Sequence, residues 1–299
     1  EKLTATDPTS GDLLFYSDGI NIYDATHQVM TNGDGIMSDP NGIQAMVVTP
    51  VPGTNNQELY YLLHRDASGT VFYTVINMNL QGNRADGPPA GQVLPAQKNV
   101  PTGITDRGDG MITLASNDMS TFWVVTQNST NLNFELHEIP AFAAGGASFP
   151  ATGNPLNLTA TVEASHLAYH PGSSRIAIVP SNNANIQIVD FNEGVPEMVS
   201  DRAVNNSFVL NENFGGSAGW SFDGTKLFFS RNTATDGNLF RIDLSDPLAS
   251  VEPVFDTPLG QSQSLLLAPD STVYNIYRET STGDRLLGRI NQPDSANTD

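Results

Sequence analysis

The chain has 299 residues, with 32 acidic and 13 basic side chains, no cysteine and a formal net charge of −19. This charge disfavours nucleic acid and anionic membrane surfaces as partners, because both repel a polyanion. The sequence contains no apolar run of about 18 residues and therefore predicts no membrane insertion. Without cysteine, disulfides and thiolate metal sites are excluded.

Short apolar runs alternate with turn residues from the N-terminus onward. The runs are rich in Val, Ile, Leu, Phe and Tyr and are bounded by Gly, Asn, Asp, Pro or Ser, which is typical of strands and turns. Helical periodicity is almost absent. The sequence therefore predicts an all-β protein.

The runs recur as units of three strands with a period of roughly 50 to 60 residues. The units begin near residues 4, 45, 111, 167, 219 and 265, and the copies that begin at 167, 219 and 265 are the clearest. Outer, fourth strands are expected at 93–96, 197–200 and 251–255, where proline indicates a sheet edge. This pattern predicts a β-propeller of six blades, each with three to four antiparallel strands.

Seven blades are the alternative. The additional blade would come from residues 138–165, or it would be missing from a truncated N-terminus. In either case, residues 1–299 are expected to form a single propeller domain excised from a longer chain.

Residues 7–19, 22–30, 32–35, 44–53, 59–62 and 73–78 follow one another in a characteristic order. Over residues 7–80 the sequence resembles the N-terminal propeller of large Bacteroidetes-type cell-surface proteins, which are associated with gliding motility or type IX secretion. Beyond residue 80 it is similar only to generic WD-type and surface-layer repeats. The resemblance implies an extracellular or cell-surface module, and it provides no catalytic residues to carry over.

These observations favour a non-catalytic scaffold that presents rim loops to a protein or glycan outside the cell, or to other domains of the same chain. Two alternatives remain open. One is a structural subunit of a surface filament or layer. The other is a propeller hydrolase or lyase with a metal on the central axis, for which no cluster of histidine and acidic residues is evident.

Structural calcium is the one cofactor that the sequence suggests. Asn32–Gly35 and Asp106–Gly110 resemble oxygen-rich calcium loops, although neither completes a known calcium motif. The expected ligands are Asp34, Asp106 and Asp109. Ordinary Gly/Asp turn chemistry explains both segments equally well. The Arg107-Gly-Asp109 tripeptide matches an integrin-type motif, but three residues match often by chance.

Three further features have structural explanations beside the functional ones. Residues 215–219 fit the G-x-S-x-G pattern around Ser217, but a strand and turn follow where a helix is required, and no histidine follows at all. A tight first strand explains this segment better. His166 and His170 are explained best as hydrogen-bonded histidines. Trp220 is the expected candidate for a sugar-stacking aromatic, which would require it to be exposed.

Overall fold

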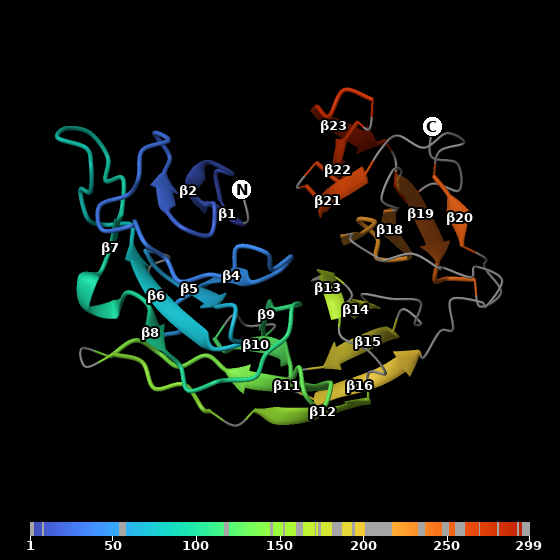
Figure 1. Ribbon diagram of the computed structural model, residues 1–299, viewed down its shortest axis with the longest axis horizontal. Helices are drawn as coiled ribbons and strands as arrows, with labels where there is room; N and C mark the ends of the chain where they lie inside the picture. The colour runs from blue at the N-terminus through green and yellow to red at the C-terminus, as the bar shows by residue number, and fades with distance from the viewer. Residues whose placement is uncertain are drawn as a thin grey trace. The chain divides into compact units, whose positions relative to one another are not determined.

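The computed structural model describes residues 3–294 except residues 8, 54–57, 117–119, 144–145, 152, 160–163, 171, 173–174, 181–186, 193–194, 201–216, 233–236, 247–250, 255–260, 269, 280 and 292. The chain divides into two compact units, residues 1–159 and 160–299 (Figure 1). Each unit is built from small antiparallel sheets.

Unit 1 contains three sheets. The first is β1 (Leu3–Thr6), β2 (Leu13–Ser17) and β3 (Ile22–Asp24). The second is β4 (Met46–Pro50), β5 (Leu59–Arg65) and β6 (Val71–Asn77), with β7 (Gln92–Val93) and β8 (Val100–Pro101) both paired to β6 and a 3₁₀ turn at Pro95–Gln97 between them. The third is β9 (Ile112–Ala115), β10 (Phe122–Gln127), β11 (Asn133–Glu138) and β12 (Asn154–Thr159).

Unit 2 also contains three sheets. The first consists of β13 (Ala164–His170), β14 (Arg175–Pro180), β15 (Gln187–Asn192) and β16 (Val195–Ser200). The second consists of β17 (Ala218–Trp220), β18 (Lys226–Asn232), β19 (Gly237–Asp243) and β20 (Glu252–Pro253). The third consists of β21 (Gln261–Leu267), β22 (Val273–Arg278) and β23 (Arg285–Ile290). Within each of these sheets the strands follow chain order, which is the meander that short turns between strands produce.

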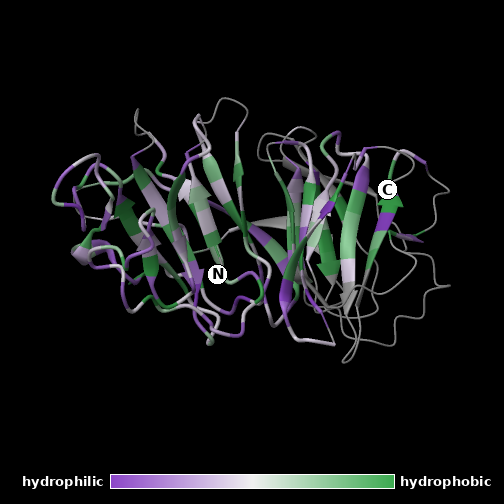
Figure 2. Cartoon of the chain, turned by 90° about the horizontal axis from the view of Figure 1, so that it is seen from above, coloured by the Kyte–Doolittle hydropathy of each residue, from purple (hydrophilic) through white to green (hydrophobic). Residues whose placement is uncertain are grey.

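Alternation along the strands lets a central sheet bury both of its faces. On β5, Tyr60 packs edge-on against Phe15, while Tyr61 packs edge-on against Tyr73 in a different core. Successive side chains point to opposite faces of a sheet, so one strand serves two cores. Figure 2 shows hydrophobic residues concentrated along the strands and hydrophilic residues in many of the connections.

The first strands of successive sheets contact one another within each unit. In unit 1, β4 contacts both β1 and β9, and in unit 2, β17 contacts both β13 and β21. Small sheets that pack face to face and meet through their first strands are what repeated blades produce. The predicted all-β, antiparallel organisation is thus confirmed.

The outer strands agree only partly with expectation. β16 lies where an outer strand was predicted, whereas β7 and β20 are each only two residues long. Residues 138–165 provide β12, the fourth strand of the third sheet, and the beginning of β13.

In the part of the chain that the structure describes, no helix has the length and apolar character needed to cross a bilayer.

His64 connects β5 to the loop before β4 and is fully buried. Its Nδ1 lies 2.9 Å from the Met37 carbonyl oxygen and its Nε2 lies 3.1 Å from Thr74 Oγ1. A carbonyl can only accept, so Nδ1 carries the proton and Nε2 accepts from the threonine hydroxyl. Burial lowers the pKa of His64 to about 4.

We predict that acid destabilises the fold through His64. The unfolded histidine takes up a proton below pH 6.5 but the folded one only near pH 4, so stability is complete above pH 6.5 and is lost as the pH falls toward 4. The loss approaches about 3 kcal/mol for this one group. Urea unfolding at pH 7.5 and 5 should show a smaller pH dependence for His64→Gln than for the wild type. Substitution of the exposed His27 by Gln is the control, and equal pH dependence in all three proteins would contradict the prediction.

Candidate functional site

Arg65, at the end of β5, binds two carboxylates. Its Nη2 lies 2.9 Å from Asp39 Oδ2 and 2.5 Å from Asp109 Oδ1, and its Nη1 donates to the Asp66 carbonyl. Asp39 comes from the loop before β4, and Asp109 from the segment that runs from β8 to β9. The guanidinium is largely buried, so the ion pairs are well shielded from water.

A second polar cluster lies on β11. Arg107 Nη2 lies 2.8 Å from Glu135 Oε2, and His137 Nε2 lies 3.5 Å from the same oxygen. His137 is fully buried and its Nδ1 is hydrogen-bonded to the Pro150 carbonyl at 3.1 Å. Burial is the main cause that lowers the pKa of His137, and the positive charge of Arg107 lowers it further. The histidine is therefore neutral at pH 7 and contributes no charge to the cluster.

The Arg-Gly-Asp tripeptide thereby joins two sheets. Arg107 binds Glu135 of the third sheet, while Asp109 binds Arg65 of the second. The backbone N–H groups of Arg107 and Gly108 bond to the Gly69 and Gln127 carbonyls. Because both charged side chains are engaged, the tripeptide is a structural clamp and is not presented for recognition.

The three expected calcium ligands do not come together. Asp34 is exposed and pairs with Lys98 at 3.1 Å, and Asp109 pairs with Arg65. Asp106 lies in a turn with a φ of 60°, and its backbone carbonyl accepts a hydrogen bond from the Ser129 N–H. Among the described residues, no group of three or more His, Cys, Asp or Glu side chains is arranged to hold a metal. Calcium binding by these aspartates stays a prediction.

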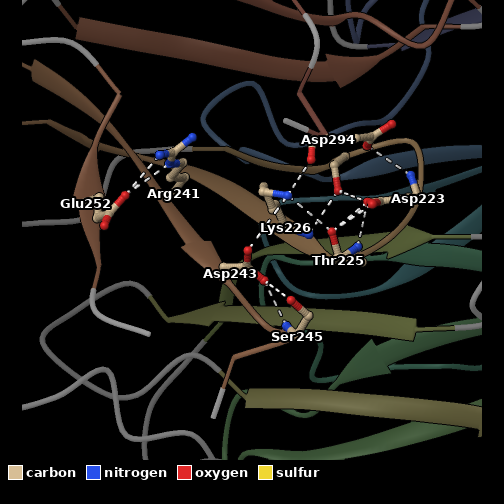
Figure 3. A network of polar contacts seen from close by, with 9 residues as sticks. Asp223, Thr225, Lys226, Arg241, Asp243, Ser245, Glu252 and Asp294 are labelled. Atoms are coloured by element: carbon tan, nitrogen blue, oxygen red, sulfur yellow. Dashed lines mark hydrogen bonds and ion pairs between the residues drawn. The ribbon is translucent and has the colours of Figure 1, made fainter. Parts of the chain in front are cut away.

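In unit 2, Lys226 anchors the chain near its C-terminus (Figure 3). Its Nζ donates to the Asp294 carbonyl oxygen at 2.6 Å and lies 3.8 Å from Asp243 Oδ2. The backbone N–H of Asp223 donates to Asp294 Oδ1 at 3.1 Å. Asp223 Oδ1 in turn accepts from the backbone N–H of Thr225. These contacts bind Asp294 to the β17–β18 turn, so the network is structural.

The expectation that Trp220 is an exposed stacking residue is wrong. The side chain is 2% exposed, and its indole N–H donates to the Ala168 carbonyl at 2.9 Å. It lies on the first strand of its sheet, where it joins a core with Leu227 and Phe229. A strand that is packed on both sides leaves no ring face for a sugar.

The two histidines of β13 differ in their surroundings. His170 Nε2 is hydrogen-bonded to the Phe222 carbonyl at 2.9 Å, as expected for a structural histidine. His166 keeps some exposed surface, but its ring is enclosed by neighbouring groups and is hydrogen-bonded to the Ala218 backbone. Its Nδ1 is shielded from water and has no partner. Ser217, which precedes Ala218, also has a buried side-chain oxygen without a partner. Each of these two residues therefore has one buried polar atom that forms no hydrogen bond.

The sequence analysis singled out His166 but explained it as a hydrogen-bonded histidine, and it did not single out Arg65 or Glu135. Arg65 ends a strand that was predicted correctly, but its partners are 26 and 44 residues away. The link between His166 and Ala218 spans a similarly large separation. The sequence does contain one signal for such residues, namely a charged or titratable residue within an otherwise apolar strand or at its end.

No protein-family model matches the sequence, and no curated protein matches it. Solved structures of the propeller type do. A protein from Thermus thermophilus that is named as an oxidoreductase of the glucose dehydrogenase kind has a TM-score of 0.53 at 13% identity, covering 96% of this chain and 95% of its own. A luciferin-regenerating enzyme has a TM-score of 0.52 at 10% identity, and the match covers 96% of this chain and 89% of that enzyme. A glucose dehydrogenase has a TM-score of 0.51 at 14% identity, and the match covers 95% of this chain and 94% of that enzyme.

These comparisons contradict the prediction of a non-catalytic display module, because the three similar structures are named as enzymes. At such low identity the likeness itself establishes only the fold. The prediction rested on a family resemblance that provided no catalytic residues and on the lack of an evident cluster of histidine and acidic residues. That was weak ground, since a propeller can assemble a site from strands that are far apart in sequence.

We predict that the clamp between the second and third sheets depends on its charges being paired. Arg107→Met leaves Glu135 partly buried without its partner and should lower the free energy of unfolding by about 3 kcal/mol. The double variant Arg107→Met/Glu135→Leu should recover most of that loss, as measured by urea unfolding.

Arg241→Met provides the control, because it breaks an ion pair whose acid, Glu252, is 55% exposed. Arg241→Met should lower the free energy of unfolding by less than about 1 kcal/mol. A double variant no more stable than Arg107→Met alone would contradict the clamp.

Proposed function

We propose that the chain is a hydrolase of the propeller fold in which His166 acts as a general base. The observation that carries this proposal is the hydrogen bonding of the His166 ring. The ring is hydrogen-bonded to the Ala218 backbone, and Nδ1 has no protein partner. We therefore assign the bond to Nε2–H as donor and the Ala218 carbonyl as acceptor, because this bond raises the pKa of the histidine. A carbonyl accepts only from a protonated nitrogen, so Nδ1 holds the lone pair of the neutral ring.

The environment keeps the ring in this form. Burial lowers the pKa of His166 to about 4, and the bond to the Ala218 carbonyl opposes that shift only in part. The ring is therefore neutral over the whole physiological range, and its tautomer is fixed by one backbone contact. A base in a fixed tautomer can accept a proton from water or from a hydroxyl group that approaches Nδ1.

The charge of the chain narrows the class of substrate. A net charge of −19 produces a field that repels anions and slows their approach. An uncharged or cationic ester, including a cyclic ester, meets no such barrier. The proposed substrate is therefore an uncharged carboxylic ester.

The finer architecture belongs to the same proposal. The six sheets of the described residues correspond in number to the six blades expected from the sequence period. The likeness of the chain to propeller-type enzymes over 95–96% of its length supports this assignment.

We also propose that the hydrolase works at the cell exterior, on the basis of the family resemblance over residues 7–80.

Hydrolysis of p-nitrophenyl acetate provides the test. The wild type should show saturable hydrolysis, and kcat/KM should stay level from pH 8 to pH 5, because the base titrates only near pH 4. His166→Gln retains an amide N–H for the Ala218 carbonyl but removes the base, and it should lower kcat/KM about 100-fold or more.

The exposed His27→Gln is the control and should retain full activity. Circular dichroism of each variant shows that the fold is intact. The proposal would be overturned by full activity in His166→Gln, or by a wild type without saturable hydrolysis.

A further inference from the structure

The strand β23 forms an edge of its sheet. The sheet has three strands in the order β21-β22-β23, and β23 pairs with β22 from Arg285 to Ile290. The other two sheets of unit 2 each have a fourth strand, β16 and β20. Within the described part of the chain, no strand pairs with the far side of β23. The backbone groups on that side can therefore pair with a strand from another molecule.

The two faces of this sheet differ in burial. Val273 and Ile290 pair across the strands and are buried in the core that the sheet shares with β18 and β19. On the opposite face, Ile276 pairs with Leu287, and their exposed fractions are 42% and 68%. Leu266 lies on that same outer face and is 65% exposed. Neighbouring apolar side chains that are this exposed indicate a surface that meets a partner.

Arginines surround these apolar side chains. Arg285 and Arg289 lie two residues on either side of Leu287, so all three point to the outer face of β23, and both arginines are exposed. Arg278 pairs with Arg285 across the strands and adds a third positive charge. The strands β21, β22 and β23 contain these three arginines and no acidic residue. The outer face is thus locally cationic in a chain whose net charge is −19.

We propose that β23 accepts an extended, acidic peptide segment of a partner protein as the fourth strand of its sheet. The segment has acidic residues opposite Arg285 and Arg289 and an apolar residue opposite Leu287, in the pattern acid-x-apolar-x-acid. Backbone hydrogen bonds to the edge provide affinity, and the pairs of side chains across the strands provide selectivity. This inference goes beyond the proposed hydrolase and does not depend on it.

The arginines also argue against a second copy of the chain as the occupant. If two β23 strands paired antiparallel about Leu287, Arg285 of each copy would lie opposite Arg289 of the other. Like charges directly opposite each other destabilise a pair of strands. Charges at an edge thereby prevent self-association, and the same charges favour an acidic strand. At physiological ionic strength, charges more than about 8–10 Å away are largely screened, so the nearest charges decide what binds at this edge.

The probe for this site is the synthetic peptide acetyl-Thr-Glu-Thr-Val-Thr-Glu-Thr-amide, whose two glutamates flank a valine at the required spacing. Calorimetric titration of the full chain should show saturable binding. The double variant Arg285→Glu/Arg289→Glu should weaken that binding about 10-fold or more, because two attractive pairs become repulsive. The same variant should prefer a peptide with lysine in place of both glutamates, whereas the wild type should prefer the glutamate peptide.

Arg84→Glu/Lys98→Glu is the matched control. It changes the net charge by the same amount but lies in unit 1, so it should bind the glutamate peptide as the wild type does. Circular dichroism of each variant shows that the fold is intact.

Two further peptides separate strand addition from a simple charge contact, and they need only the wild type. Each carries N-methyl groups on alternate residues, one on the odd and the other on the even positions. Alternate N–H groups of an extended strand point to opposite sides, so one methylated peptide should lose binding and the other should retain it. Retention by both, or loss by both, would overturn strand addition.

Hydrogen exchange resolved to single amides tests whether the edge is open. Alternate amides of β23 should exchange rapidly in the free protein and slowly when the peptide is bound. Slow exchange of every β23 amide in the free protein would mean that the edge is already occupied, which overturns the proposal. Equal affinity of the wild type for the glutamate and lysine peptides, a lack of saturable binding, or a dimer that the peptide dissociates would also overturn it.

Discussion

The constraint on which this structure depends is that each of its sheets is too small to bury its own faces. Sheets of three to five strands expose apolar side chains on both sides, and only a neighbouring sheet can cover them. This explains why adjacent aromatic residues such as Phe228 and Phe229 belong to two different cores. It also explains why polar contacts are needed where one sheet gives way to the next.

Two of the basic residues, Arg65 and Arg107, bind acidic side chains at such places. Arg65, Arg107 and Lys226 lie at strand ends or in connections, are largely buried, and bind acidic side chains or carbonyl groups. The chain has 32 acidic and 13 basic residues, so acidic partners are plentiful. A buried base without a partner would destabilise the fold, so stability depends on which acid each buried base binds. The same arrangement explains why Asp109 is a structural residue in this fold.

The fold could be predicted from sequence to the extent that local patterns determine it. Alternating apolar runs identified strands such as β5, β10 and β18, and turn residues separated them. The strand β12 was missed because residues 154–159 mix proline and asparagine into a strand. Trp220 was misjudged because exposure depends on which strands pack against β17, and local sequence does not encode that.

The candidate site could not be predicted for the same reason. The hydrogen bond between the His166 ring and the Ala218 backbone joins residues that lie far apart along the chain. Local patterns do not report such contacts, whereas strand packing creates them. The non-catalytic prediction relied on a family resemblance and on residues that are visible in the sequence, and neither reports which side chains meet in space.

The central proposal is that His166 is neutral and that its Nδ1 holds the lone pair of the ring. A ¹⁵N-detected NMR titration of the five imidazoles, with His166→Gln to assign the signal, measures both its tautomer and its pKa. The account predicts an Nε2–H tautomer whose pKa is about 4. An Nδ1–H tautomer, or a titration near the ordinary value of about 6.5, would contradict it.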